Sequence, residues 1–132
     1  MGKLPAAYER FQRTHRRAWE AYDHLGAAVH QEGPLDPRIR ELVKLGMAIG
    51  GRLEGAVHSH ARRALEAGAS AAEIAHVVSL AITTVGFPTA VAAFTWVEET
   101  LKRGRASAKG KGERGGSRSG HGRRREARGG SE

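Results

Sequence analysis

Of the 132 residues, 22 are Lys or Arg and 14 are Asp or Glu, which gives a net charge of +8. Residues 1–101 contain 11 basic and 11 acidic residues, so the whole excess of positive charge lies in residues 102–132. The chain contains no Cys, which excludes disulfides, thiolate nucleophiles and Cys-ligated zinc. It has no apolar run of about 18 residues and its N-terminal sequence is not that of a signal peptide, so we expect a cytoplasmic protein without a membrane partner.

Helical periodicity runs through five segments of the chain, and no strand pattern persists. We expect helices over residues 5–28, 36–50, 53–67, 71–84 and 88–101. Asp36 is a typical N-cap for the second helix, and Ser70 with Glu73 forms a capping box before the fourth. Gly68 suits the left-handed position that ends the third helix. The sequence therefore predicts an all-α domain of about five helices.

A change in composition divides the chain into two parts. Residues 1–103 form the predicted all-α domain, whereas residues 104–132 contain no aromatic residue and no Leu, Ile, Val or Met. Such a segment cannot bury enough apolar area to offset the entropy of ordering, so we expect a disordered, basic, Gly/Arg/Ser-rich tail. Its charge favours weak, salt-dependent contact with polyanions, and the lack of aromatic side chains makes that contact non-specific.

Two histidines of the third expected helix, His58 and His60, are candidate acid/base residues. On a helical wheel His60 lies on the apolar face, while His58 lies about 160° away and one turn after Glu54. Hydrogen-bonded structural histidines are one alternative. A metal site is another, in which Glu54 and His58 supply two ligands and His60, Glu41 or His76 supplies a third.

Three pieces of the sequence resemble the carboxymuconolactone decarboxylase / alkylhydroperoxidase D-like family. They are LDPRIREL at residues 35–42, HARRALEAGASAAEI at residues 60–74 and GFP at residues 86–88. The resemblance covers residues 35–101. It implies an all-α fold built around an antiparallel helical hairpin, assembled as a homotrimer or homohexamer.

The antioxidant branch of this family carries a Cys-x-x-Cys pair, a His four residues after the second Cys, and a Glu on the preceding helix. By that spacing His60 matches the His, Glu41 matches the Glu, and the Cys positions fall on Leu53 and Ala56. Thiol-based peroxide reduction needs a thiolate and a resolving thiol. The resemblance therefore permits a peroxiredoxin label, but the residues exclude its thiol mechanism.

The lactone decarboxylase branch of the family has no obligatory Cys pair and acts on a small anionic carboxylated lactone. A Glu commonly stands four residues before its helix His; here Ala56 precedes His60 at that distance, and Glu54 precedes His58. The candidate cations for an anionic substrate are Arg40, Arg52 and Arg62.

The leading hypothesis is a cysteine-free member of this family that works on a small carboxylated or carbonyl substrate. It would use His60 with Glu41, or His58 with Glu54, in acid/base chemistry of the decarboxylase or lactone type. No cofactor is predicted, although a metal ion remains an alternative. The rival functions are a metal-dependent oxidoreductase or hydrolase with a Glu/His site, and a non-enzymatic oligomeric scaffold with a polyanion-binding tail.

Overall fold

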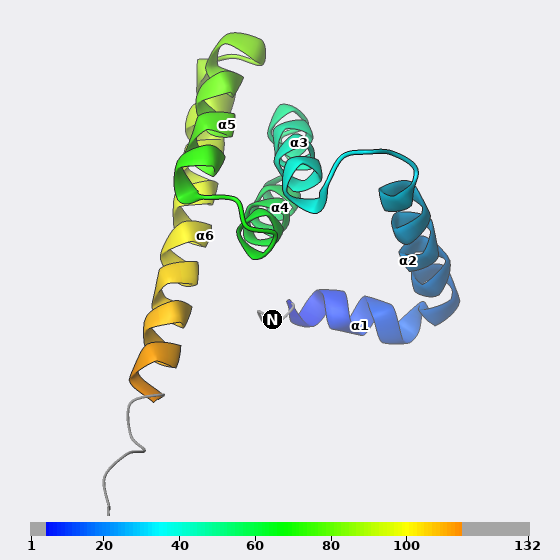
Figure 1. Ribbon diagram of the computed structural model, residues 1–132. Coiled ribbons are helices and arrows are strands. Elements are labelled where there is room, and N and C mark those ends of the chain that lie inside the picture. Colours follow the sequence, from blue (N-terminus) through cyan, green and yellow to red (C-terminus); the bar gives the residue numbers. More distant parts are fainter. Residues whose placement is uncertain (1–4, 115–132) are drawn as a thin grey trace, which may run out of the picture.

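The computed structural model describes residues 5–114, with residues 108 and 111–114 described by their backbone alone. These residues form six α-helices and no strand, which confirms the all-α class (Figure 1). The helices are α1 (Ala6–Thr14), α2 (Arg16–Gln31), α3 (Pro37–Gly50), α4 (Glu54–Glu66), α5 (Ala71–Thr84) and α6 (Phe87–Arg114). None of these described helices is both long enough and apolar enough to cross a membrane.

The ends of α3, α4 and α5 are set by the residues that the sequence predicted. The Asp36 carboxylate accepts a hydrogen bond from the amide of Ile39 at 2.9 Å. The Ser70 hydroxyl accepts from the amide of Glu73 at 3.0 Å, and the Glu73 carboxylate accepts from the amide of Ser70 at 2.9 Å. Gly68 has a φ of 97°, a conformation that L side chains rarely adopt, and it lets the chain turn from α4 toward α5.

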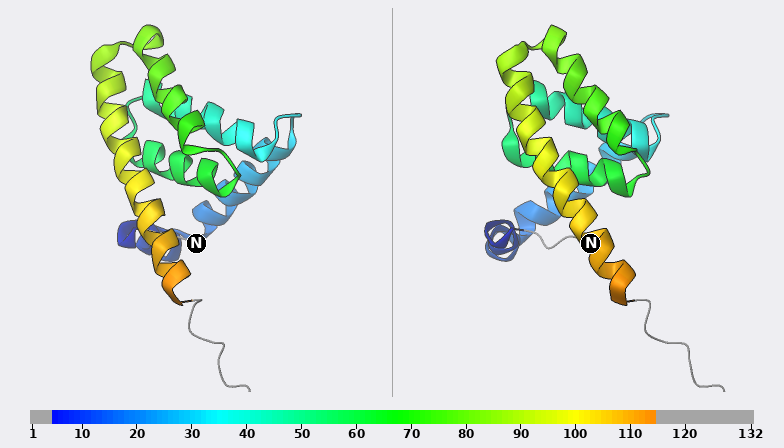
Figure 2. Two further views of the ribbon diagram at one scale, coloured as in Figure 1. Left: turned by 60° about the vertical axis from the view of Figure 1, so that its left-hand side comes forward. Right: turned by 90° about the vertical axis from the view of Figure 1, so that its left-hand side faces the viewer.

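The hydrophobic core lies among α3, α4, α5 and α6. Leu45 and Ile49 of α3, Val57 of α4 and Ile74 of α5 are fully buried. Small side chains let the helices approach closely, and the buried alanines among the described residues are Ala48, Ala61, Ala64, Ala69, Ala81, Ala90 and Ala93. Helix α4 packs against both α3 and α6, while α5 and α6 run side by side as a hairpin (Figure 2). This arrangement holds α4 in the middle of the helical body.

The N-terminal region contains two helices where the sequence predicted one over residues 5–28. The break lies at His15, which has φ −123° and ψ 49°. The Thr14 hydroxyl donates to the carbonyl of Arg10 at 2.8 Å and contacts Nδ1 of His15 at 3.0 Å. Such side-chain bonding to the preceding turn competes with regular helix geometry and bends helices. The described fold therefore has six helices instead of about five.

Helix α6 continues through residues 104–114, the first part of the predicted tail. Ala106 and the lysines of this segment are good helix formers, and Gly104 lies near the Leu65 side chain of α4. A domain boundary drawn from apolar composition alone, at residue 103, therefore lies before the end of α6. The rest of the expected tail, residues 115–132, lies outside the described residues, so its disorder and its polyanion contact stay predictions.

Helices α1 and α2 form an N-terminal arm beside the body of α3–α6 (Figure 1). No residue of either helix is buried. Trp19 packs edge-on against Tyr8, with ring centroids 5.2 Å apart, and lies 5.7 Å from Tyr22. Leu25 and Val29 remain exposed on the same arm. The arm is thus held together by its own aromatic contacts and not by the core.

Candidate functional site

The hairpin of α3 and α4 brings Glu41 and His60 together. The two helices are antiparallel and joined by a tight turn at Gly51, so residues about equally far from this turn lie opposite each other. Glu41 is about ten residues before the turn and His60 about nine after it. Their pairing, which the family spacing implied, is therefore a direct result of the hairpin register.

Nδ1 of His60 lies 2.8 Å from Oε2 of Glu41. The carboxylate side chain is 7% exposed and the imidazole 16% exposed, so little water competes for this hydrogen bond. An ionised carboxylate only accepts hydrogen bonds, so the proton of this contact belongs to Nδ1. Glu41 thereby orients the imidazole ring, and Nε2 lies on the side of the ring away from the carboxylate.

Nε2 of His60 forms no hydrogen bond with the described residues. Within that part of the chain, the one buried side-chain nitrogen or oxygen without a partner is Nε of Arg40. Nε2 of His60 is therefore not sealed in the protein and can meet solvent or a small molecule. An imidazole held by a carboxylate on one nitrogen and open on the other is suited to accepting and donating protons.

His58 faces a different helix. Its Nδ1 lies 2.7 Å from the hydroxyl oxygen of Thr100 on α6, and that hydroxyl donates to the carbonyl of Trp96 at 3.3 Å. The Thr100 oxygen is therefore the acceptor for the Nδ1 proton of His58. Nε2 of His58 lies 3.7 Å from carboxylate oxygens of both Glu54 and Glu99. This histidine links α4 to α6.

The four predicted site residues thus form two separate pairs within one chain. Glu41 with His60 lies between α3 and α4, whereas Glu54 with His58 lies toward α6. His76, one of the three candidates for a third metal ligand, is exposed on α5. The described residues include no group of three or more His, Cys, Asp or Glu side chains placed to hold a metal ion. A metal site that takes a ligand from a second chain stays a prediction.

The three cations proposed for an anionic substrate differ in their surroundings. Arg40 immediately precedes Glu41 on α3, and its guanidinium is partly buried. Arg52 has a left-handed φ of 53° and donates to the buried hydroxyl of Thr89 at 2.8 Å. It therefore ties the α3–α4 turn to the start of α6. Arg62 is half-buried on α4. Of these three, Arg40 is the one next to Glu41 in the sequence.

Sequence reasoning missed two residues close to Glu41, namely His30 and Lys44. Nζ of Lys44 lies 2.6 Å from Nε2 of His30, and Arg40 donates to the His30 carbonyl at 3.3 Å. Burial lowers the pKa of His30, and the nearby charges of Lys44 and Arg40 lower it further. Lys44 sits one turn after Glu41 on α3, which was a readable signal. His30 follows no helical pattern that would have placed it here.

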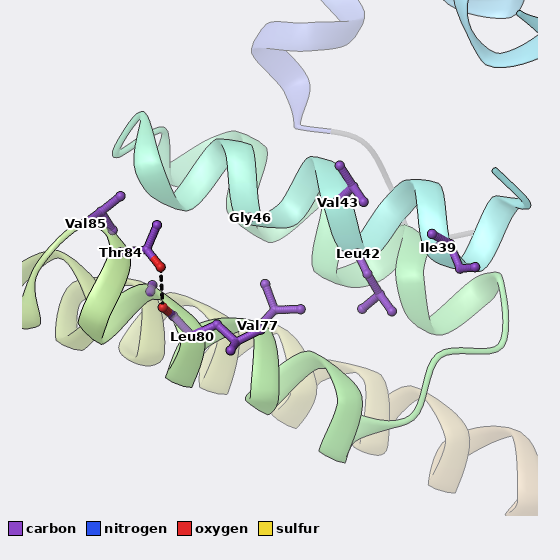
Figure 3. A pocket seen from close by; sticks show the side chains of 9 residues that line it. Ile39, Leu42, Val43, Gly46, Val77, Leu80, Thr84 and Val85 are labelled. Atoms are coloured by element: carbon purple, nitrogen blue, oxygen red, sulfur yellow. Dashed lines mark hydrogen bonds between the residues drawn. The ribbon is translucent and has the colours of Figure 1, made fainter. Parts of the chain in front are cut away.

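A separate apolar groove of about 400 Å³ lies between α3 and α5 (Figure 3). Its lining consists of Ile39, Leu42, Val43, Gly46, Val77, Leu80, Ala81, Thr84 and Val85. The Thr84 hydroxyl donates to the Leu80 carbonyl at 2.8 Å, so its polar group is already used by its own helix. The groove contains no titratable side chain. It offers an apolar surface and no acid/base chemistry.

The fold and the site define a cysteine-free helical protein whose central hairpin buries a carboxylate–imidazole pair. A model of the carboxymuconolactone decarboxylase family matches residues 16–99, and the chain belongs to that family. Among solved structures, it is similar to the apo form of a carboxymuconolactone decarboxylase family protein from Legionella pneumophila. The TM-score is 0.62 and the identity 21%, over 71% of this chain and 87% of that one, so this likeness shows the fold. The comparison with curated proteins gives no match.

Proposed function

We propose that the protein performs acid/base chemistry of the decarboxylase or lactone type on a small carboxylated or carbonyl substrate. His60 carries the proton, and Glu41 orients and stabilises its ring. The observation that carries this proposal is the 2.8 Å bond between Nδ1 of His60 and the buried Glu41 carboxylate, which leaves Nε2 open. Family membership supports the reaction class, and the absence of Cys removes the thiol route.

A decarboxylation requires one proton transfer from the protein. When a carboxylate on the carbon next to a carbonyl group loses CO₂, the electron pair of the broken C–C bond passes into that carbonyl and forms an enolate. Nε2–H of the His60 imidazolium then protonates the enolate carbon, and the ring takes a new proton from water. The net reaction consumes one proton and releases one CO₂. Glu41 stabilises the imidazolium between turnovers because its negative charge faces Nδ1 in a site with little water.

In this proposal His58 takes no part in the proton transfer and serves as a structural link between α4 and α6. Its Nδ1 is occupied by Thr100, and both nearby carboxylates, Glu54 and Glu99, are exposed. The Glu54–His58 pair therefore offers a solvated site in which water screens the charges. That difference in burial is the reason for placing the proton transfer at His60.

We also propose that the active form is a homotrimer or homohexamer. Large apolar side chains remain exposed on the body, among them Met47, Phe87 and Phe94, together with the groove between α3 and α5. Monomeric proteins rarely expose contiguous apolar patches of this kind. Light scattering coupled to size-exclusion chromatography tests this assembly. A monomer at micromolar concentration would contradict it.

The functional test compares two histidine variants on one substrate panel. The panel contains carboxylated lactones and keto acids, and the readout is CO₂ release. We expect His60→Gln to lower kcat by about 100-fold or more, since general acid catalysis contributes about that much. His58→Gln is the matched control and retains most of the activity. Full activity of His60→Gln, or a loss confined to His58→Gln, would contradict the assignment.

A further inference from the structure

Basic side chains outnumber carboxylates around His30, on the side of α3 that carries Glu41. Arg40 and Lys44 extend from α3 and bond to His30, and Arg63 on α4 adds a smaller lowering of the His30 pKa. Among the side chains that the structure describes, no carboxylate lies within ion-pair distance of any of these three cations. The nearby carboxylate, Glu41, is already bonded to His60. The region therefore holds positive charge that the described residues do not neutralise.

The guanidinium of Arg40 contains the unpartnered buried nitrogen noted above, Nε. Its neighbour NH1 donates to the carbonyl of His30 at 3.3 Å. Buried N–H groups are nearly always hydrogen-bonded, and a buried charge is normally paired. A buried N–H of a cation that has no hydrogen-bond partner points to an anionic acceptor that binds at this nitrogen.

The ammonium group of Lys44 has a neutral partner. An ammonium donates its protons, so at 2.6 Å Nε2 of His30 must be the unprotonated acceptor. The lowered pKa of His30, caused first by burial and then by Lys44 and Arg40, agrees with a neutral ring. Glu41 opposes this shift and Arg63 adds to it. Arg40 and Lys44 are thus both bonded to uncharged groups of His30, in the last turn of α2, which supply acceptors but no compensating charge.

We propose that the last turn of α2 covers an anion site, in which a small carboxylate binds Arg40 and Lys44 in place of His30. This inference rests on the proposed function, because the bound group is the carboxylate of the substrate that reacts at His60. An ionised carboxylate gives charge-assisted hydrogen bonds, which are about twice as strong as neutral ones. It therefore competes well against the ring and carbonyl of His30.

Helix α2 is suited to release this turn. None of its residues is buried, and both described side-chain hydrogen bonds between α2 and α3 involve His30. Displacing His30 therefore disturbs no core packing. Lys44 follows Arg40 and Glu41 by about one helical turn, so the three side chains lie on neighbouring parts of α3, and all three act on His30. A carboxylate held by the two cations is therefore close to the Glu41–His60 pair.

Malonate binding to the full-length protein tests the site without any turnover. Calorimetry gives the affinity, and the His30 ring signal in NMR reports its displacement. We expect Lys44→Met to weaken malonate binding by about tenfold or more, as loss of a charge-assisted contact does. Lys102→Met is the control because it removes the same charge from a residue paired with Glu98 on α6. The malonate affinity of Lys102→Met stays within about twofold of that of the original protein.

Three results would overturn the proposal: no malonate binding by the original protein, equal losses in Lys44→Met and Lys102→Met, or phosphate binding more tightly than malonate. Circular dichroism identifies a variant that has unfolded, and Lys44→Gln then replaces Lys44→Met. Malonate binding is also measured in His60→Gln, where we expect it to persist. Persistent binding in a protein without decarboxylase activity would refute the proposed function alone, while loss of binding in an active enzyme would refute this site alone.

Discussion

Replacing the two members of the Glu41–His60 pair by leucine, singly and together, should give strongly non-additive losses of stability. His60→Leu leaves the Glu41 carboxylate buried without a partner. Glu41→Leu leaves only an imidazole N–H unpaired, in a side chain that is more exposed than the carboxylate. The double variant replaces both polar groups by apolar ones of similar size, which removes the unpaired group altogether.

The expected magnitudes follow from burial. Removing one partner of a buried ion pair costs about 3–5 kcal/mol, and His60→Leu should approach the lower end of this range because the imidazole retains some solvent contact. Glu41→Leu should cost about 1–3 kcal/mol, the desolvation cost of an unpaired donor. The double variant should be no less stable than His60→Leu. The coupling energy of the cycle is then about 2 kcal/mol.

Urea denaturation followed by circular dichroism measures the free energy of unfolding of all four proteins. The exposed ion pair of Arg16 and Glu20, at 3.0 Å on α2, is the control cycle. Its side chains are 81% and 57% exposed, so its coupling should be below about 1 kcal/mol. Additivity of the Glu41 and His60 substitutions within about 0.5 kcal/mol would refute a buried, coupled pair.

Three further predictions concern the scaffold and the arm. Ile74→Ala removes a fully buried side chain and should cost about 2–5 kcal/mol in urea denaturation; a loss below about 1 kcal/mol would contradict its core position. Ser70→Ala removes the cap of α5 and should cost about 1 kcal/mol, whereas Ser79→Ala on the exposed side of that helix should cost much less. Because the pKa of His30 is lowered from 6.5, the folded protein binds that proton less readily than the unfolded chain. The stability from neutral His30 is therefore complete above about pH 6.5 and declines as the pH falls below it. Amide protection of α2, corrected for intrinsic exchange, should fall with pH, and an unchanged profile would count against the His30–Lys44 contact.

The helical body was predictable because its boundaries depend on local chemistry. Asp36, Ser70 with Glu73, and Gly68 each act within one turn of the chain, so their spacing alone places the ends of α3, α4 and α5. The break at His15 was missed because Thr14 bonds back to its own helix without any Gly or Pro to mark the position. Helical propensity carried α6 beyond the point where the apolar stripe ends.

The candidate site was predictable only in part. The wheel of α4 separated His58 from His60, and the family spacing selected Glu41 as the partner of His60. His30 contacts Lys44, 14 positions away in the sequence, and His58 contacts Thr100, 42 positions away. No periodicity specifies such contacts, because they depend on how the arm and α6 are placed against the hairpin.

The central claim is that Glu41 holds His60 so that Nε2 is the nitrogen open to a reactant. Long-range ¹H–¹⁵N NMR of the histidine side chains in mildly alkaline solution reports which nitrogen of the neutral ring carries the proton. We expect the proton of His60 on Nδ1 in the original protein, and a shift toward the Nε2–H form in Glu41→Leu. A ring that is protonated on Nε2 in the original protein, or is unaffected by Glu41→Leu, would contradict the account.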